Sequence, residues 1–177
     1  KNLEDLPVSL SIMNPAVTKQ EYLLYLNLMR DVVKDAEINV FPALENIITD
    51  LQERKKSHLI DNDLKALGII AENGIKTQLS INAGGISTGY ALGVFYVIEG
   101  SSLGGRVILK NINAALGYDA SNGASYFAGY GGQTGSRWKD FLEILQNFEA
   151  ENEVADEIIA GADFAFNAIT AHFIQNS

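Results

Sequence analysis

The sequence predicts an all-α protein. Over most of the chain, apolar residues recur at spacings of three and four, which is the period of an amphipathic helix. The sequence has neither the strand-helix alternation of a parallel sheet nor an internal repeat. A chain of 177 residues, 47% of them hydrophobic, is long enough to bury one core. We therefore predict a single-domain helical bundle over residues 1–177.

The first long helix is predicted to start at a capping box. Thr18 and Glu21 are placed so that their side chains satisfy backbone donors at a helix start. The helical spacing weakens between Ala36 and Asn39 and then resumes, so the pattern predicts one long helix with a bend, or two helices. The apolar residues of this pattern are Tyr22, Tyr25, Leu26, Met29, Val32, Val33, Phe41, Leu44, Ile47, Ile48 and Leu51.

Shorter and later helices are predicted from the same spacing. Asp61 or Asp63 is expected to cap a short helix that runs through Ile70. Two C-terminal helices are expected from the apolar sets Trp138, Phe141, Leu145 and Phe148, then Val154, Ile158, Ala162, Ala165, Ile169 and Phe173.

The central helix is expected to run from Ser87 to Leu116, with Gly117 as its C-terminal stop. Its apolar stripes lose their side chains at Gly100, Gly104 and Gly105. Each glycine in a helix interior costs roughly 1 kcal/mol relative to alanine. Something should offset that cost, and glycines also permit a kink.

Two interpretations of these glycines stay open. Small residues four apart, such as Gly100 and Gly104 or Gly89 and Gly93, let another helix cross closely. Alternatively, a planar and largely apolar ligand lies against bare backbone. Spacing alone does not separate the two.

Residues 117–135 form a long connection rich in glycine, serine, asparagine and tyrosine. A structureless segment of this length is unusual in a compact domain. We predict that it either holds a short helical turn around Ser125 to Ala128 or lines a site.

The composition excludes several classes of protein. Thirteen basic against 22 acidic residues give a formal net charge of −9, so we expect no nucleic acid partner. The absence of cysteine excludes disulfides and thiolate metal sites. The apolar runs are shorter than the ~20 residues that span a bilayer, and we expect a cytoplasmic protein with no membrane partner. The Glu-x-x-His pairs of di-iron helical enzymes do not occur.

Two stretches resemble the bacterial heme oxygenase family. Residues 96–108, YVIEGSSLGGRVI, resemble its distal-helix signature, and residues 126–145, YFAGYGGQTGSRWKDFLEIL, are similar to a second family segment. The stretches NLEDLPVS, TKQEYLLYL and DEIIAGADFAFNAI resemble its first two helices and its last. The resemblance thus covers nearly the whole chain and implies a heme oxygenase-like fold. Where the mammalian branch has aspartate, this chain has Ser101, as in many bacterial members.

The resemblance implies that heme, as substrate and prosthetic group, lies between a proximal helix near the N-terminus and the kinked central, or distal, helix. It implies ring opening to biliverdin, carbon monoxide and ferrous iron, with electrons from a ferredoxin or a flavin reductase. The catalytic segment would be Gly100, Ser101, Gly104 and Gly105. Bare backbone at the last two glycines would lie against the macrocycle, and Ser101 would help to hold water.

The resemblance also implies five heme-contacting residues: Ser102, Tyr126, Tyr130, Arg137 and Lys139. Ser102 would join the water network, although its hydroxyl could equally bond its own preceding turn. Lys139, or Arg137 beside it, would pair with the heme propionates, although such residues commonly cover apolar surface with their stems. The tyrosines could reach the pocket or pack as amphipathic caps.

The chain departs from the family at the iron ligand. The proximal histidine would fall at or just ahead of Lys1, and because Lys1 is not a methionine we expect some native residues to precede it. The histidines present are His58, expected at the surface, and His172, expected at the surface or the edge of the core. Neither stands where the family places its ligand.

Three functions stay open. The first is a heme oxygenase. The second is a non-catalytic relative that binds heme or a linear tetrapyrrole, which becomes the better choice if the native chain lacks a proximal histidine. The third is a helical interaction domain whose glycines serve packing only. The sequence determines neither the position of ring opening nor the oligomeric state.

Overall fold

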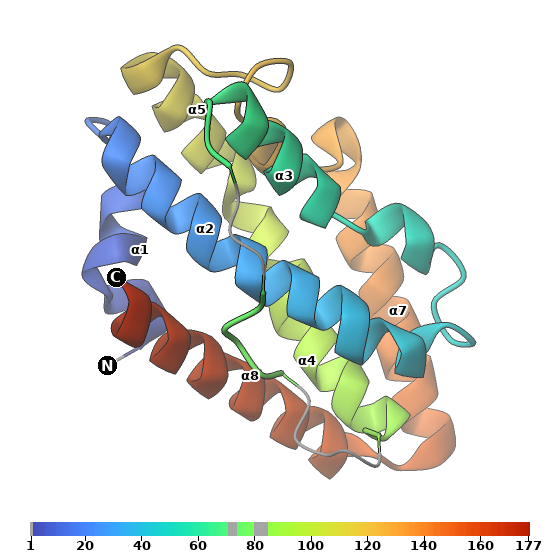
Figure 1. Cartoon of the computed structure of the whole chain (residues 1–177). Coiled ribbons are helices and arrows are strands. Elements are labelled where there is room, and N and C mark those ends of the chain that lie inside the picture. Colours follow the sequence, from blue (N-terminus) through green and yellow to red (C-terminus); the bar gives the residue numbers. More distant parts are fainter. Residues whose placement is uncertain (1, 71–73, 80–84) are drawn as a thin grey trace.

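The structure, a computed structural model, describes residues 2–70, 74–79 and 85–177 (Figure 1). Within these ranges the chain is helical and forms no strand, which confirms the all-α prediction. The α-helices are α1 (Pro7–Ile12), α2 (Lys19–Asp35), α3 (Ser57–Ala66), α4 (Thr88–Gly100), α5 (Gly105–Leu116), α6 (Ser125–Ala128), α7 (Thr134–Asn152) and α8 (Ala155–Asn176). Shorter segments are the 3₁₀ turns η1 (Leu3–Asp5), η3 (Phe41–Leu44), η4 (Leu51–Arg54), η5 (Ser101–Gly104) and η6 (Gly131–Gln133), and the π-helical η2 (Ala36–Val40).

The capping box predicted at Thr18 is present at the start of α2. The backbone nitrogen of Glu21 donates to Thr18 Oγ1 (3.3 Å), and Glu21 Oε2 accepts from the backbone nitrogen of Thr18 (2.8 Å). After Asp35 the helix passes into η2 and then η3, whose second residue is Pro42. A π turn widens the helix, and proline lacks a backbone donor. The predicted bend is therefore a change from α to π and then 3₁₀ geometry.

The predicted start of the helix before Ile70 is wrong. Helix α3 already begins at Ser57, because Glu37 Oε1 accepts from the backbone nitrogens at this helix start, at 2.7 and 2.8 Å. Asp61 and Asp63 consequently lie inside α3 and do not cap it.

Asp63 instead caps a different helix. Its carboxylate accepts from the backbone nitrogens of Ser125 and Tyr126, both at 2.8 Å. These are the first residues of α6, so a carboxylate from α3 satisfies the donors at the start of α6. The short helical turn predicted within residues 117–135 is thereby confirmed.

The central helix spans the predicted range but consists of three parts. The side chain of Ser87 accepts from the backbone nitrogen of Tyr90 (3.2 Å) at its start, and Gly117, with a φ of 73°, ends it. The 3₁₀ turn η5 interrupts it between α4 and α5. The predicted kink therefore lies at the glycine-rich level.

The segment Thr88–Leu116 is long and apolar enough to cross a membrane by length and composition alone. In the fold, 50% of its most apolar window is buried. Figure 1 shows α4 behind α2, between α7 and α8, and α4 contacts both α7 and α8. Such packing is typical of the core helix of a soluble protein.

Helices α4 and α8 cross at two glycines, one on each helix. A Cβ on Gly93 would overlap the carbonyl oxygen of Ile158, and a Cβ on Gly161 would overlap that of Tyr90. The backbones thus approach as closely as side-chain-free residues allow. The helix-crossing interpretation is correct for Gly93 and for Gly89, where a Cβ would lie 2.8 Å from Glu157 Oε2.

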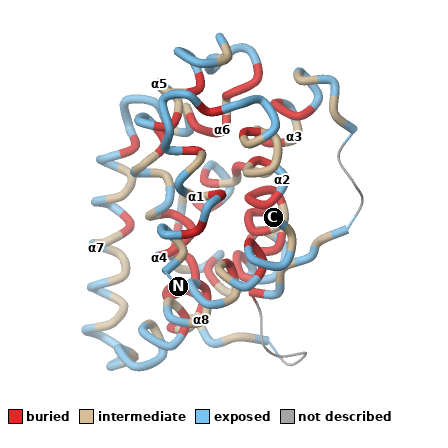
Figure 2. Tube along the Cα trace, turned by 90° about the vertical axis from the view of Figure 1, so that its left-hand side faces the viewer, coloured by how far each residue is buried: buried red, intermediate tan, exposed pale blue. Residues whose placement is uncertain are grey.

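An aromatic cluster fills the core beside this crossing. Phe95 of α4 packs edge-on against Phe41, with ring centroids 5.4 Å apart, and against Phe141 of α7, at 5.0 Å. Edge-to-face packing is the favoured arrangement of such rings. Figure 2 shows that buried positions gather inside the bundle, whereas the side of α7 that faces away from it is exposed. The central helix therefore packs through a side chain at Phe95 and through its bare backbone at Gly93.

Replacing Gly161 by alanine is predicted to destabilise the fold, because the new Cβ would push α8 away from α4. We expect the free energy of unfolding to fall by about 1–3 kcal/mol. The control is Gly135→Ala in α7, where a Cβ would meet nothing within 4 Å and alanine should stabilise by about 0.5–1 kcal/mol. Urea unfolding followed by circular dichroism measures both changes. Equal stability of Gly161→Ala and the parent protein would contradict the close crossing.

Candidate functional site

A cavity of about 540 Å³, here called the larger cavity, lies between the N-terminal segment and the central helix. Its size falls within the roughly 300–1,000 Å³ of small-molecule sites. Its lining residues are Leu3, Glu4, Ser9, Ile12, Met13, Tyr25, Met29, Val32, Tyr96, Val97, Ile98, Gly100, Ser101, Leu103, Ile108, Trp138, Phe166, Ile169 and Phe173. Helices from both ends of the chain thus form one apolar space.

Exposed apolar side chains lie among these lining residues. Met13, Tyr96, Leu103 and Phe166 are 46%, 39%, 47% and 45% exposed. Clusters of exposed apolar groups mark ligand grooves or interaction sites. Glu4 is the one charged residue among the described residues that line the larger cavity.

The three glycines at the kink differ in what they face. Gly100 lines the larger cavity, and a Cβ there would make ordinary contact with Trp138 at 3.4 Å. A Cβ on Gly104 would meet nothing within 4 Å, but Gly104 is not, as was predicted for it, among the described residues that line the larger cavity. Gly105 does not present bare backbone to the larger cavity as predicted, because a Cβ there would lie 2.8 Å from the carbonyl oxygen of Phe127. Gly105 therefore lets α6 pack closely on the central helix.

The two serines of η5 bond their own helix. Ser101 Oγ donates to the carbonyl of Ile98, and Ser102 Oγ donates to the carbonyl of Glu99, both at 2.6 Å. For Ser102 this is the local alternative considered above. Each hydroxyl oxygen keeps acceptor capacity after donating its proton, so water could still bind there.

A second cavity, of about 30 Å³, lies on the other side of η5 and is here called the smaller cavity. It is lined by Tyr25, Met29, Lys56, Ser101, Ser102, Gly105, Ile108, Tyr126, Phe127, Ala128, Gly129 and Thr134. Its volume exceeds the roughly 10–15 Å³ that one water needs, and its polar lining suits water. Ser101 lines both cavities, so it stands at their boundary.

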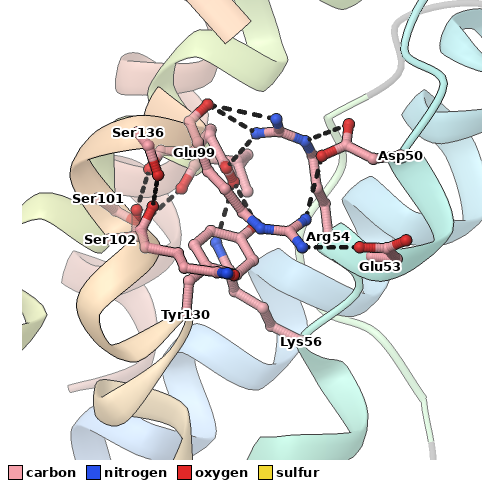
Figure 3. A network of polar contacts seen from close by, with 12 residues as sticks. Asp50, Glu53, Arg54, Lys56, Glu99, Ser101, Ser102, Tyr130 and Ser136 are labelled. Carbon is pink, nitrogen blue, oxygen red and sulfur yellow. Dashed lines mark hydrogen bonds and ion pairs between the residues drawn. The ribbon is translucent and has the colours of Figure 1, made fainter. Parts of the chain in front are cut away.

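A buried carboxylate organises the side chains next to the kink (Figure 3). Glu99 is the last residue before Gly100 and is 1% exposed. Its Oε1 accepts from Arg54 Nη1 (2.6 Å), and its Oε2 accepts from Lys56 Nζ and from the Tyr130 hydroxyl (both 3.0 Å). Burial raises the pKa of Tyr130, and the adjacent Glu99 charge raises it further. Tyr130 therefore stays protonated and acts as a donor.

The network extends from Arg54 towards the surface. Asp50 accepts from Arg54 Nε (2.8 Å) and from Arg137 Nη1 (3.0 Å), while Glu53 accepts from Arg137 Nη2 (2.7 Å). Arg54 also donates to the carbonyl oxygen of Arg137 at 3.2 and 3.3 Å. Segment η4 and helix α7 are thus tied together beside the end of α4.

The predicted heme contacts do not all reach the larger cavity. Arg137 is held by two carboxylates, Lys139 is exposed on α7, and neither they nor Tyr130 are among the residues lining that cavity. Tyr126 and Ser102 line the smaller cavity. Burial raises the pKa of Tyr126, whereas its hydrogen bond with Ser101 acts in the opposite direction.

Arg54, Lys56 and Glu99 were not among the residues that the sequence pointed to. A usable signal was present for Glu99, because a single carboxylate directly after the apolar run of residues 90–98 must be either paired or exposed. For the cations no such signal existed. Arg54 and Lys56 stand in a polar stretch typical of solvated surface.

The two histidines lie away from the larger cavity. His58 is exposed on α3. His172 is buried in α8, where its Nε2 lies 3.2 Å from the carbonyl oxygen of Leu28 and 3.5 Å from Asp31 Oδ2. His172 therefore belongs to the core, and the expectation of a surface or edge position is corrected.

The pH dependence of stability is predicted to include a contribution from His172. Burial lowers its pKa below the ordinary 6.5, so the unfolded chain takes up a proton first as pH falls. The stabilisation is present above about pH 6.5 and is lost below it, by at most about 1.4 kcal/mol per pH unit. His172→Gln should flatten this slope and His58→Gln should not. Urea unfolding between pH 5 and 8 measures both, and equal slopes in parent and His172→Gln would contradict the assignment.

Replacing Glu99 by alanine is predicted to cost about 3–5 kcal/mol of unfolding free energy, because Arg54 and Lys56 would lose their shared buried counter-charge. The matched control is Glu143→Ala on the exposed side of α7, which should change stability by less than about 0.5 kcal/mol. Chemical denaturation compares them. Similar small losses in both variants would show that the network contributes little.

Comparison with known proteins identifies the family. The heme oxygenase family model matches residues 70–175. Heme oxygenase PigA of Pseudomonas aeruginosa is 33% identical over 125 residues, which are 71% of this chain; the chain spans 61% of the length of that relative. The crystal structure of the NO- and CO-bound heme oxygenase from Neisseria meningitidis superposes with a TM-score of 0.80 at 27% identity, covering 99% of this chain and 84% of that one. The fold predicted from the resemblance is thus confirmed, and the chain belongs to the heme oxygenase family.

Proposed function

We propose that this chain binds heme in the larger cavity and degrades it. The observation that carries the proposal is an apolar space of about 540 Å³ directly against the kink, with Gly100 and Ser101 in its wall. A flat ring packs closely only against a surface free of large side chains. Membership of the heme oxygenase family supports the same ligand and reaction class.

The residues that line the larger cavity fit the ring of heme better than its iron. Apolar side chains on α2, α4 and α8 suit a macrocycle. An imidazole is absent from the described lining residues, whereas heme proteins commonly ligate iron through histidine. A proximal histidine at or just ahead of Lys1 stays a prediction, and we assign the ligand role to no described residue.

We propose that the products are biliverdin, carbon monoxide and ferrous iron, and that a ferredoxin or a flavin reductase supplies the electrons. Bound heme supplies the reaction with dioxygen. The chain supplies shape and hydrogen bonding: Gly100 leaves the wall bare, and Ser101, which carries a hydroxyl, lines both cavities. Val97 and Ile108, which are 7% and 6% exposed, add apolar surface to this wall.

Lys139 remains the proposed partner of the heme propionates. It is exposed on α7 and follows Trp138, which lines the larger cavity. Arg137 is a poorer choice, because Asp50 and Glu53 already hold its guanidinium. A cytoplasmic location also remains a proposal.

A second function applies if no histidine precedes Lys1. Segments η1 and α1 form part of the wall of the larger cavity, and the described residues of that wall include no histidine. Without imidazole ligation, a protein with this cavity would bind heme or a linear tetrapyrrole and leave the ring intact. The two functions share the binding site and differ in turnover.

Hemin titration followed by reductant addition tests both. Under the first function the Soret band forms on titration and then gives way to biliverdin absorbance. Gly100→Leu should weaken hemin binding at least about tenfold, because the added side chain would occupy space needed by the ring. Gly135→Leu, at an open position on α7, is the control and should bind as the parent does.

A Soret band that persists under reductant and dioxygen would favour the second function. Failure of the parent protein to bind hemin at all would overturn both and leave a helical interaction domain. Retained helical circular dichroism in Gly100→Leu is required before its loss of binding is interpreted.

A further inference from the structure

We infer that Lys56 supplies protons to the larger cavity through the smaller one, and this inference rests on the proposed function. Reducing dioxygen to water takes up protons together with electrons, so a heme-degrading site needs a proton source. No lysine, arginine or histidine is among the described residues that line the larger cavity. A basic side chain that releases a proton to this cavity would therefore lie beyond that wall.

Lys56 is placed to be that source. It is 6% exposed, and its Nζ lies 3.0 Å from Glu99 Oε2 and 4.4 Å from the ring centroid of Tyr130. It also lines the smaller cavity together with Ser101 and Ser102. The side chain thus joins the buried network on one side and a water-sized space on the other.

The route to the larger cavity passes through Ser101. The smaller cavity has room for at least one water, and Ser101 lines both cavities, as Tyr25, Met29 and Ile108 also do. A hydroxyl can accept one proton and release another as it rotates. Tyr126 borders the same space and forms a hydrogen bond with Ser101, so the hydroxyl has a second partner there.

The charges around Lys56 allow it to release its proton. Glu99 contacts both Lys56 and Arg54, so Arg54 still pairs with Glu99 after Lys56 has lost its proton. The guanidinium group does not lose its proton in proteins. Of the two cations that contact Glu99, Lys56 is therefore the one that can release a proton. Burial lowers the pKa of Lys56, and Glu99 opposes that shift. Glu37 contacts the backbone nitrogen of Lys56, and Tyr130 stays protonated.

Asp50, Glu53 and Arg137 also belong to the charged network around Lys56. Arg137 lies over the same Tyr130 ring, at 4.9 Å, and pairs with Asp50. Arg137 also pairs with Glu53, so its charge is shared between two carboxylates. Glu99 is the carboxylate that contacts Lys56 Nζ directly, and burial acts against its effect on the pKa of Lys56.

Each step of the proposed transfer moves one proton. The Lys56 ammonium gives one proton to water in the smaller cavity, and that water gives one to Ser101 Oγ. Ser101 releases its original proton into the larger cavity and returns to a neutral hydroxyl. The neutral amine then regains a proton from solvent. Lys56 acts through water and Ser101, so it is a positioning residue that does not touch the ligand.

Two variants separate proton supply from structure. Lys56→Met removes the proton and the charge, whereas Lys56→Arg keeps the charge beside Glu99 but does not release a proton. We expect both to lower the turnover rate of bound hemin by at least about tenfold, within the range of acid-base effects, with hemin affinity within about twofold of the parent. In the parent protein, the turnover rate should fall as pH rises through the pKa of Lys56. In both variants, the turnover rate should not show this fall.

A readout independent of heme is the titration of the Lys56 ammonium by NMR in the ligand-free protein, assigned by its absence in Lys56→Met. A pKa well below the ordinary value of about 10.4 supports the inference, and an ordinary or higher value overturns it. If the parent turns over hemin and both variants match its pH profile, only the Lys56 inference fails. If the parent binds hemin without turnover, the oxygenase function fails and the role of Lys56 fails with it.

Discussion

The carboxylate of Glu99 holds the site together. It is buried at the end of α4, immediately before the kink, where an unpaired charge would be very costly. Three hydrogen bonds to this carboxylate, from Arg54, Lys56 and Tyr130, offset that cost. These partners come from η4, from the residue before α3 and from the segment before α7, so pairing one charge fixes three separate segments around η5. The kink and the smaller cavity, which Lys56 lines, lie directly beside this arrangement.

The glycines of the central helix serve two different purposes along its length. Gly93 allows the backbone of α8 to approach, and Gly105 allows α6 to do so. Gly100, in contrast, borders the larger cavity, and Gly104 is open. The helix-crossing interpretation is therefore correct at Gly93, whereas contact of a ligand with Gly100 stays a proposal. Close packing at both ends of the kink holds the exposed backbone between them in place.

Periodicity predicted the helices well, because the spacing of apolar residues reports directly on which face is buried. The capping box at Thr18 and the stop at Gly117 were predictable because both are local. Capping by residues far away in the sequence was not predictable. Glu37 caps the start of α3 and Asp63 caps the start of α6, and the local sequence shows neither pairing. For the same reason the resemblance pointed to the kink, whereas the cations that neutralise Glu99 come from a stretch that reads as surface.

Serine at position 101 constrains where a proton can be stored. A carboxylic acid at this place could both hold and pass a proton, whereas a serine hydroxyl only passes one. Ser101 already donates to the carbonyl of Ile98 (2.6 Å), so its free capacity towards water is as an acceptor. An acceptor at the boundary of two cavities needs a donor on one side. The smaller cavity provides that donor in Lys56, and the buried Glu99 keeps its ammonium within reach of water.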